Sequence, residues 1–229
     1  MLTDDEQSAF QESIARVRQL AARSLRQAAN ADEAITFVMN LHRSLDTVAE
    51  QAGATGPAPD CKAGCAHCCH VRVEATDPEV FHIARHLQAL PATALAAVAK
   101  RLQQHAETAR QGAPRQACSF LQENRCTIYT VRPAVCRKAH SLSVQHCASL
   151  APQIPQNLRL LVDAEALMAG TAQAYADAAM PAHAHELNAA VWAALRDPTA
   201  LRRWYEGDAA VLEHSHAVQS PGGPSTPGI

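Results

Sequence analysis

The stretch CKAGCAHCCH, at residues 61–70, places four cysteines and two histidines within ten residues. Thiolates and imidazoles are the protein ligands that zinc and iron–sulfur centres take. A C-x2-C pair such as Cys65 and Cys68 can turn both sulfurs toward one ion, but Cys68 and Cys69 are adjacent. Because successive side chains diverge, these two thiolates fit two ions or one multinuclear cluster better than a single tetrahedral ion. Otherwise, one of them is a spare reactive thiol.

A second group of four cysteines follows between residues 118 and 147, at spacings of eight, ten and eleven residues. Four plus four thiols would fill two sites of four cysteines each, or would ligate one iron–sulfur cluster and leave up to four thiols over. We therefore predict that all eight cysteines are metal ligands. They are Cys61, Cys65, Cys68, Cys69, Cys118, Cys126, Cys136 and Cys147.

Disulfides are the other common use of an even number of cysteines. The N-terminus MLTDDEQSAF is acidic where a secretory signal would be basic, and no apolar segment follows it. We therefore expect a cytoplasmic protein, in which cysteines more often bind metal or act in redox chemistry. The confinement of all eight to residues 61–147 also argues against a framework of disulfides, which would be spread more widely.

Positive charge gathers around the cysteines. Residues 60–147 carry 11 Lys and Arg against 6 Asp and Glu, a balance of +5, and because the whole chain carries −2 the remainder carries −7. A divalent ion held by four thiolates is dianionic, and nearby cations favour that state. A solvated loop surface would carry the same charges, so the pattern supports metal binding without requiring it.

Histidines provide further candidate ligands. Any of the four that lie beside the cysteines could replace a thiolate in a site of three cysteines and one histidine. These four are His67, His70, His140 and His146. The pairs His183/His185 and His214/His216 could bind metal adventitiously. His82 and His86 lie one helical turn apart, without the glutamate of an HExxH motif, and we interpret them as part of a polar face.

The flanking regions follow helical periodicity. Thr3 and Glu6 form a capping box before a helix that reaches about residue 30, where Asn30 starts the next helix. These two helices predict an N-terminal hairpin, and the breakers of residues 53–60 end it. A capping box of Thr76 and Glu79 starts a helix after the first cysteine group. Further helices are expected over 92–111, 156–179, 182–196 and 201–206.

The predicted fold is mainly α-helical, because the apolar content of 48% is rich in alanine while aromatic residues make up 4%. A helical hairpin and C-terminal helices would surround an irregular, cysteine-rich metal-binding core. We expect the hairpin at residues 1–55, the cysteine-cluster metal-binding domain at 56–150 and the C-terminal helices, packed on the core, at 151–212. The tail at 213–229, rich in Pro, Gly and Ser, is expected to be disordered.

Composition excludes two classes of partner. A net charge of −2 and few aromatic residues argue against a nucleic-acid binder, which would carry a basic surplus. No apolar run approaches the roughly 20 residues that a membrane span needs. A metal ion is the expected partner, and a protein partner stays open.

The segment from residue 61 to residue 147 resembles the YkgJ-like cysteine-cluster family, whose members carry a CxxCxxCC domain to which zinc or iron chelation is ascribed. The eight cysteines carry this resemblance in order, together with the start of the helix at Thr76–Glu79 and a few residues of the second stretch. These are Phe120, Leu121, Thr127, Ile128, Tyr129, Arg132, Pro133 and Arg137. The first spacing departs from the family pattern, since three residues rather than two separate Cys61 from Cys65.

Residues and resemblance together predict a protein that binds zinc or iron through up to eight cysteine thiolates, with an iron–sulfur cluster as one form of the centre. The alternative is an iron–sulfur enzyme of the group-transfer or redox type, acting on a protein or a small molecule. The surplus of thiols and the adjacent pair favour the alternative, whereas the lack of a recognisable cosubstrate motif favours binding alone. No catalytic residue can be named from the sequence, which leaves open whether the protein is an enzyme.

Overall fold

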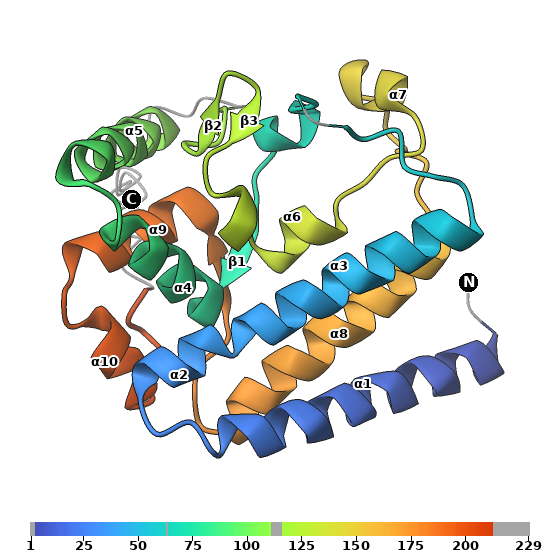
Figure 1. Cartoon of the computed structure of the whole chain (residues 1–229), viewed down its shortest axis with the longest axis horizontal. Helices are drawn as coiled ribbons and strands as arrows, with labels where there is room; N and C mark the ends of the chain where they lie inside the picture. The colour runs from blue at the N-terminus through green and yellow to red at the C-terminus, as the bar shows by residue number, and fades with distance from the viewer. Residues whose placement is uncertain (1–2, 63, 111–115, 213–229) are drawn as a thin grey trace, which may run out of the picture.

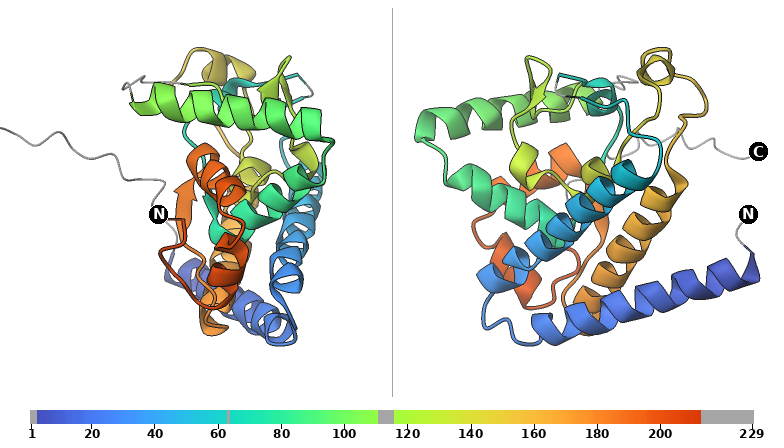
Figure 2. Two further views of the ribbon diagram at one scale, coloured as in Figure 1. Left: turned by 90° about the vertical axis from the view of Figure 1, so that its left-hand side faces the viewer. Right: turned by 45° about the vertical axis from the view of Figure 1, so that its right-hand side comes forward.

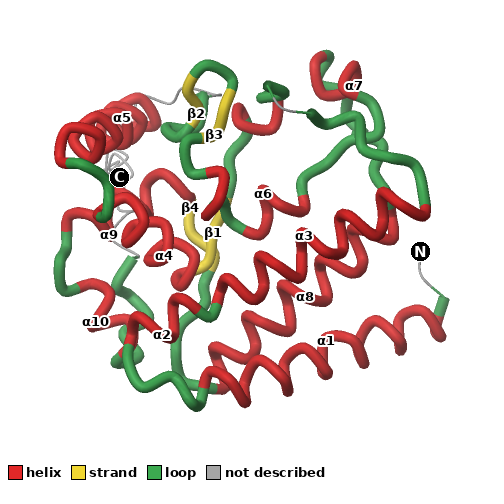
Figure 3. The backbone as a smooth tube through the Cα atoms, viewed as in Figure 1, coloured by secondary structure: helices red, strands yellow, loops and turns green. Residues whose placement is uncertain are grey.

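The computed structural model describes residues 3–62, 64–110 and 116–212, and thus every cysteine. The tail at 213–229, with His214 and His216, lies outside the described residues. Most of the described chain is helical (Figure 3), which confirms the predicted fold class. Within this part of the chain, no helix is both long and apolar enough to cross a membrane.

The N-terminal helices begin where their caps predict. Helix α1 (Asp4–Leu25) starts after Thr3, whose hydroxyl accepts a hydrogen bond from the backbone of Glu6 while the Glu6 carboxylate accepts one from the backbone of Thr3. Asn30 caps α2 (Ala31–Thr36). A break at Phe37 separates α2 from α3 (Val38–Thr55), so two helices replace the single one expected here.

A helix from the C-terminal part completes this layer. Helix α8 (Leu158–Asp177) packs against both α1 and α3, and it fills the space between these splayed arms (Figure 1). Gly170 lets α1 approach closely, because a Cβ atom at this position would lie 2.6 Å from the Cβ of Val17 and 2.7 Å from the carbonyl oxygen of Ile14. The N-terminal and C-terminal helices therefore share one packed unit.

Two strand–helix units form the neighbouring layer. Strand β1 (Glu74–Thr76) leads into α4 (Asp77–Gln88), and β4 (Ala184–Glu186) leads into α9 (Leu187–Arg196). The two strands pair antiparallel, with Ala75 opposite His185, and α4 packs against α9. The helix expected from residue 182 therefore starts later, at Leu187. Residues 184–186 pair with β1 instead, and the Glu186 carboxylate caps α9.

The core joins these layers. Trp204 of α10 (Ala200–Tyr205) is fully buried, and its ring lies 5.6 Å from that of Phe81 and 6.1 Å from that of Tyr175, centroid to centroid. The Tyr175 hydroxyl donates a hydrogen bond to the carbonyl oxygen of Ala34, at 2.7 Å. Helix α5 (Ala92–Arg110) packs on the outer side of α9. The C-terminal helices thus contribute to this hydrophobic core.

The cysteine-rich segments are built from short elements joined by loops. Several of them lie together at one end of the molecule, above α3 in Figure 1, and the turned views agree (Figure 2). These elements are η1 (His67–His70), β2 (Leu121–Gln122), β3 (Arg125–Cys126), η2 (Tyr129–Val131), α6 (Ala134–Lys138) and α7 (Val144–Ala148). An irregular, cysteine-rich region is therefore present at one end of a mainly helical protein.

Candidate metal centre

Backbone hydrogen bonds tie the two cysteine stretches together at both ends. The N–H of Cys118 donates to the carbonyl oxygen of Cys69 at 2.8 Å, which joins the end of the first stretch to the start of the second. The N–H of Asp60 donates to the carbonyl oxygen of Ser141 at 2.8 Å, and the Asp60 carboxylate accepts from the N–H of Val144 at 2.9 Å. Cysteines almost 90 residues apart in sequence therefore belong to one region.

All eight cysteines are unpaired thiols in the structure. Loops carry Cys61, Cys65 and Cys118, and short elements carry the remaining five. Those five are Cys68 and Cys69 in η1, Cys126 in β3, Cys136 in α6 and Cys147 in α7. Because the short elements make few backbone hydrogen bonds of their own, something other than secondary structure must stabilise this region.

Cys61 belongs to one end of the region. Its Sγ accepts a hydrogen bond from the N–H of Ser141 at 3.3 Å, a contact that stabilises a thiolate. Burial nevertheless raises the pKa of Cys61, and repulsion from thiolates at Cys65, Cys68 and Cys147 raises it further. Cys65, Cys68 and Cys147 are thus close enough for their charges to act on Cys61.

A different set of thiols surrounds Cys69. Burial raises the pKa of Cys118 to about 12, and it also raises the pKa of Cys126 and of Cys136. Repulsion from the Cys126 thiolate contributes at Cys69, at Cys118 and at Cys136. Cys69, Cys118, Cys126 and Cys136 thus form a second group, which spans both sequence stretches.

The adjacent pair links the two groups. A hydrogen bond from the Cys69 thiol lowers the pKa of Cys68 to about 6, and the same contact raises the pKa of Cys69. Negative charge on Cys68 raises the pKa of thiols in both groups, namely Cys61, Cys118, Cys126 and Cys136. Cys68 is exposed to solvent, whereas Cys69 is half-buried.

The sulfur atoms are neighbours, but they are not close enough together to coordinate one ion. Bonds of about 2.3 Å to a tetrahedral ion place sulfurs roughly 3.8 Å apart. Among the described residues, no three sulfur atoms lie within 4.8 Å of one another. The group of three ligand atoms that does so belongs to Asp77, His183 and His185. The donor set fits zinc or iron in chemistry, and side-chain rotation would have to bring its members closer.

Arginines lie beside this region, as the charge pattern predicts. The Arg132 guanidinium stacks on the ring of Tyr129 at 3.8 Å. Its charge contributes to the lowered pKa of Cys68, and at Cys126 it opposes the rise in pKa that burial causes. Arg137, next to Cys136, is buried and donates to the carboxylate of Asp46 in α3 at 2.7 Å. One arginine thus acts on the thiols through its charge, and the other holds α6 against α3.

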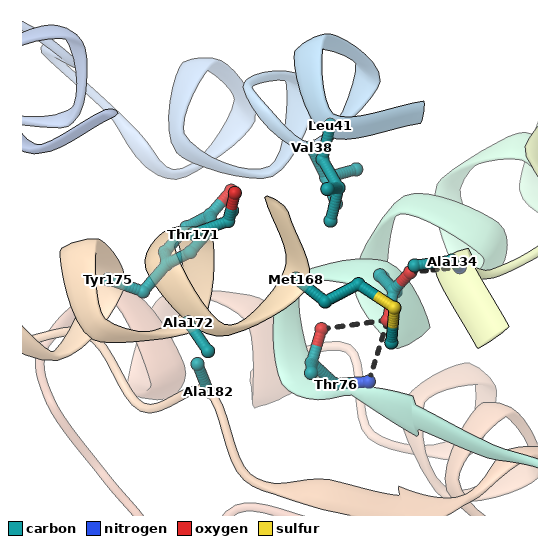
Figure 4. A pocket seen from close by; sticks show the side chains of 10 residues that line it. Val38, Leu41, Thr76, Ala134, Met168, Thr171, Ala172, Tyr175 and Ala182 are labelled. Carbon is teal, nitrogen blue, oxygen red and sulfur yellow. Dashed lines mark hydrogen bonds between the residues drawn. The ribbon is translucent and has the colours of Figure 1, made fainter. Parts of the chain in front are cut away.

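Glu79 anchors the base of the region. Its carboxylate accepts hydrogen bonds from Thr76, as the capping box predicts, and also from the N–H of Ala134 at the start of α6. Thr76 and Ala134 line a small cavity of about 30 Å³ beside Met168 (Figure 4). A cavity of this size holds about one water molecule. This site is therefore structural rather than a substrate pocket.

The neighbouring histidines differ in their availability as ligands. Both ring nitrogens of His140 are engaged, Nδ1 with the carbonyl oxygen of Lys138 at 2.9 Å and Nε2 with the N–H of Asn157 at 2.7 Å. The Nδ1 of His146 contacts the Ser143 hydroxyl at 2.8 Å. His140 thus acts as a structural residue, although the sequence made it a candidate ligand.

An open depression lies beside the adjacent cysteines. It has a volume of about 310 Å³ and is lined by His67 and His70 of η1 together with Ala148 and Leu150. The Leu150 side chain is exposed, as is the Cys68 side chain between the two histidines in sequence. The surface near Cys68 is therefore accessible to other molecules.

Comparison with known families gives one match. Residues 60–155 match the CxxCxxCC family, described as a putative zinc- or iron-chelating domain. Neither a curated protein nor a solved structure matches the chain. The match covers both groups of cysteines and Glu79, and it leaves α1–α3 and α8–α10 outside. The cysteine-rich region of this protein is thus similar to the CxxCxxCC domain, over less than half of the chain.

Proposed function

We propose that the protein binds zinc or iron through the thiolates of its eight cysteines, in two groups that meet at Cys68 and Cys69. The first group would comprise Cys61, Cys65, Cys68 and Cys147. The second would comprise Cys69, Cys118, Cys126 and Cys136. This division gives each adjacent cysteine its own group, as the divergence of successive side chains requires.

The observation that carries the proposal is the mutual repulsion of thiolates from both stretches. Burial and neighbouring negative charge raise the pKa of Cys61, Cys118, Cys126 and Cys136, so these thiols are costly to ionise alone. A soft cation reverses this cost, because it deprotonates a coordinating thiol and neutralises its charge. Half-buried thiols without disulfide partners are therefore well suited to metal ions.

Metal analysis after anaerobic purification tests the proposal. A colourless protein with zinc would indicate closed thiolate sites, and a brown protein with several irons would indicate an iron–sulfur cluster. Cys65→Ser and Cys136→Ser take one ligand from each group, and each should lower the metal content of its own group. The control is His146→Ala, next to Cys147, which should keep the full metal content. The proposal fails if both cysteine variants retain all the metal and the native fold.

A second candidate function is an iron–sulfur enzyme of the group-transfer or redox type. The observation that favours it is Cys68, whose thiolate is exposed beside an open depression and whose pKa the Cys69 thiol lowers to about 6. A thiolate with a low pKa that solvent can reach is characteristic of reactive cysteines. Broad visible absorption that is bleached by a reductant would favour this candidate, and a colourless zinc protein would rule it out.

The cytoplasm remains the location that we propose. The eight free thiols support it, since an oxidising compartment would convert close thiols to disulfides. Mass spectrometry of the protein alkylated at lysis would report the number of free thiols in the cell.

A further inference from the structure

A buried carboxylate meets two imidazoles at the strand pair, away from the cysteines. Asp77 is fully buried, and its Oδ1 lies 3.0 Å from the Nε2 of His185, which is 4% exposed. His183 is exposed. One ligand atom from each of these three residues lies within 4.8 Å of the other two. Among the described residues, these three form the group whose potential ligand atoms lie close enough together to hold one metal ion.

The strand register explains why these residues converge. Ala75 pairs with His185 and Thr76 with Ala184, so Asp77 follows directly opposite His183. The N–H of Asp77 donates to the carbonyl oxygen of His183 at 3.2 Å, and the N–H of His183 donates to Asp77 Oδ2 at 2.6 Å. Residues two apart in a strand point to the same face. His183, His185 and Asp77 therefore share one face, opposite the face of Glu74 and Glu186.

The buried carboxylate of Asp77 needs a positively charged partner. A buried carboxylate is costly unless it is paired with a positive charge. Among the described residues, Asp77 forms an ion pair with His185, whose imidazole is charged only when it is protonated. No Lys or Arg of the described residues lies within ion-pair distance of this carboxylate. A metal ion bound to both imidazoles and the carboxylate would supply the missing positive charge.

We propose that Asp77, His183 and His185 form a sulfur-free site for a divalent transition-metal ion, separate from the cysteine groups. Two imidazoles and one carboxylate suit Zn²⁺, Fe²⁺, Co²⁺ or Ni²⁺, whereas Ca²⁺ and Mg²⁺ take oxygen ligands. Because His183 is exposed, water can complete the coordination of the ion. Such a site has open positions, unlike a closed site of four thiolates.

His183→Ala tests the site with little risk to the fold, since this side chain is exposed. The zinc content of the full chain would be measured after equilibrium dialysis against buffered Zn²⁺. The variant should hold one ion fewer than the natural protein, or bind that ion at least tenfold more weakly. The matched control is His86→Ala, nine residues beyond Asp77 and about 14 Å along α4. It should retain the ion, and the histidines of residues 213–229 remain in both variants.

Cobalt distinguishes this site from the cysteines. Thiolate-bound Co²⁺ gives intense sulfur-to-cobalt charge-transfer absorption in the near ultraviolet, whereas a site without sulfur gives only weak visible bands. His183→Ala and Asp77→Asn should remove visible intensity and leave the charge-transfer bands intact. Cys65→Ser should instead lower the charge-transfer bands, so that failure of the thiolate sites and failure of this site are separable. Equal metal content in His183→Ala and the natural protein would overturn the proposal, as would equal losses in His183→Ala and His86→Ala.

Discussion

The carboxylate of Glu79 accepts a hydrogen bond from the backbone N–H of Ala134 at 2.6 Å. Glu79 belongs to the first turn of α4, whereas Ala134 opens α6, the short helix that carries Cys136. A capping residue that would ordinarily serve its own helix thus also holds a second element, two residues from a predicted metal ligand. The position of that thiol depends on a buried carboxylate rather than on the five-residue helix alone.

Replacing Glu79 by glutamine should therefore be costly. Burial opposes ionisation of Glu79, but hydrogen bonds from His42, Ala134 and Thr76 outweigh it and hold its pKa below the usual range. The variant would direct an amide NH2 group toward donors and leave a buried group unsatisfied, which costs about 3 kcal/mol. Urea unfolding of the metal-loaded protein would measure this loss in the free energy of unfolding.

The matched control for Glu79→Gln is Glu6→Gln. Thr3 and Glu6 form the same capping box as Thr76 and Glu79, but on the exposed first turn of α1. There, water replaces the lost hydrogen bonds, so the variant should lower the stability much less than Glu79→Gln does. Equal effects at the two positions would contradict the assigned role of Glu79 in holding α6.

Close packing between α1 and α8 gives a second prediction. Gly170→Ala would place a Cβ atom against the Cβ of Val17 and the carbonyl oxygen of Ile14, at distances that real atoms do not adopt. The two helices must separate, and the expected loss of stability is about 1–3 kcal/mol. Thermal unfolding would detect it as a lower Tm. Val17→Ala should give no rescue, because the Cβ atom and the backbone oxygen remain.

Gly53 provides the control for Gly170. It lies within α3, and nothing lies within 4 Å of a Cβ atom built at this position. Gly53→Ala should therefore stabilise the protein by about 0.5–1 kcal/mol, through a lower entropy of the unfolded chain and a higher helix propensity. A decrease in Tm for Gly53→Ala would show that helix propensity does not govern this end of α3.

Local signals allowed much of the helical structure to be predicted. The capping boxes at Thr3 and Thr76 and the cap at Asn30 all mark real helix starts, because a cap is formed by residues three positions apart. The breakers near residue 53 were less reliable, since α3 continues through Gly53 to Thr55. Burial of the apolar face of α3 outweighs the modest helix penalty of one glycine.

Long-range pairing could not be predicted in the same way. Strands β1 and β4 are three residues each and lie over 100 residues apart, so neither has a periodic pattern of its own. Their pairing is what places Asp77 against His183 and His185. The H-x-H spacing drew attention to the two histidines, but the partner carboxylate looked like an ordinary residue of a helix first turn. The grouping of the cysteines likewise depends on loops, whose course the sequence does not encode locally.

The adjacent thiols yield a prediction for the metal-free protein. The hydrogen bond from the Cys69 thiol lowers the pKa of Cys68 to about 6, so Cys68 should react first with iodoacetamide, with a half-maximal rate near pH 6. Cys69→Ala removes the donor and should move this midpoint toward the ordinary thiol range. Cys69→Ser keeps a hydroxyl donor and should move it less. Mass spectrometry of peptides alkylated at a series of pH values would measure both shifts.

Two results would contradict this role of Cys69. One is a midpoint for Cys68 near pH 9 in the natural protein, and the other is an equal midpoint in the alanine and serine variants. Metal loading adds an independent check, because coordination removes the thiolate from solution. Zinc should protect Cys68 from alkylation if it is a ligand, and unprotected Cys68 in the loaded protein would favour a reactive thiol instead.

His82 leads to a prediction about pH. It lies on α4 with its Nδ1 buried and without a hydrogen-bond partner, and its ring centroid is 6.0 Å from that of His42. Burial lowers the pKa of His82 to about 4, and positive charge on His42, Arg85, His86 and Arg137 contributes. Between pH 6.5 and pH 4, the unfolded chain therefore binds a proton that the folded protein does not. The stability that the neutral imidazole of His82 contributes at pH 7 is therefore lost as the pH falls from 6.5 to 4.

His82→Phe tests this linkage, since a phenyl ring fills a similar space and does not titrate. The variant should match the natural protein at pH 7, where the imidazole is neutral in both states. At pH 5 it should be more stable by about 2 kcal/mol, the linkage energy for pKa values of about 4 and 6.5. Urea unfolding with a chelator present at both pH values removes the contribution of acid-labile thiolate sites. Parallel stability curves for the two proteins would mean that His82 accepts its proton in the folded state as readily as in the unfolded chain, and that burial on α4 does not govern its ionisation.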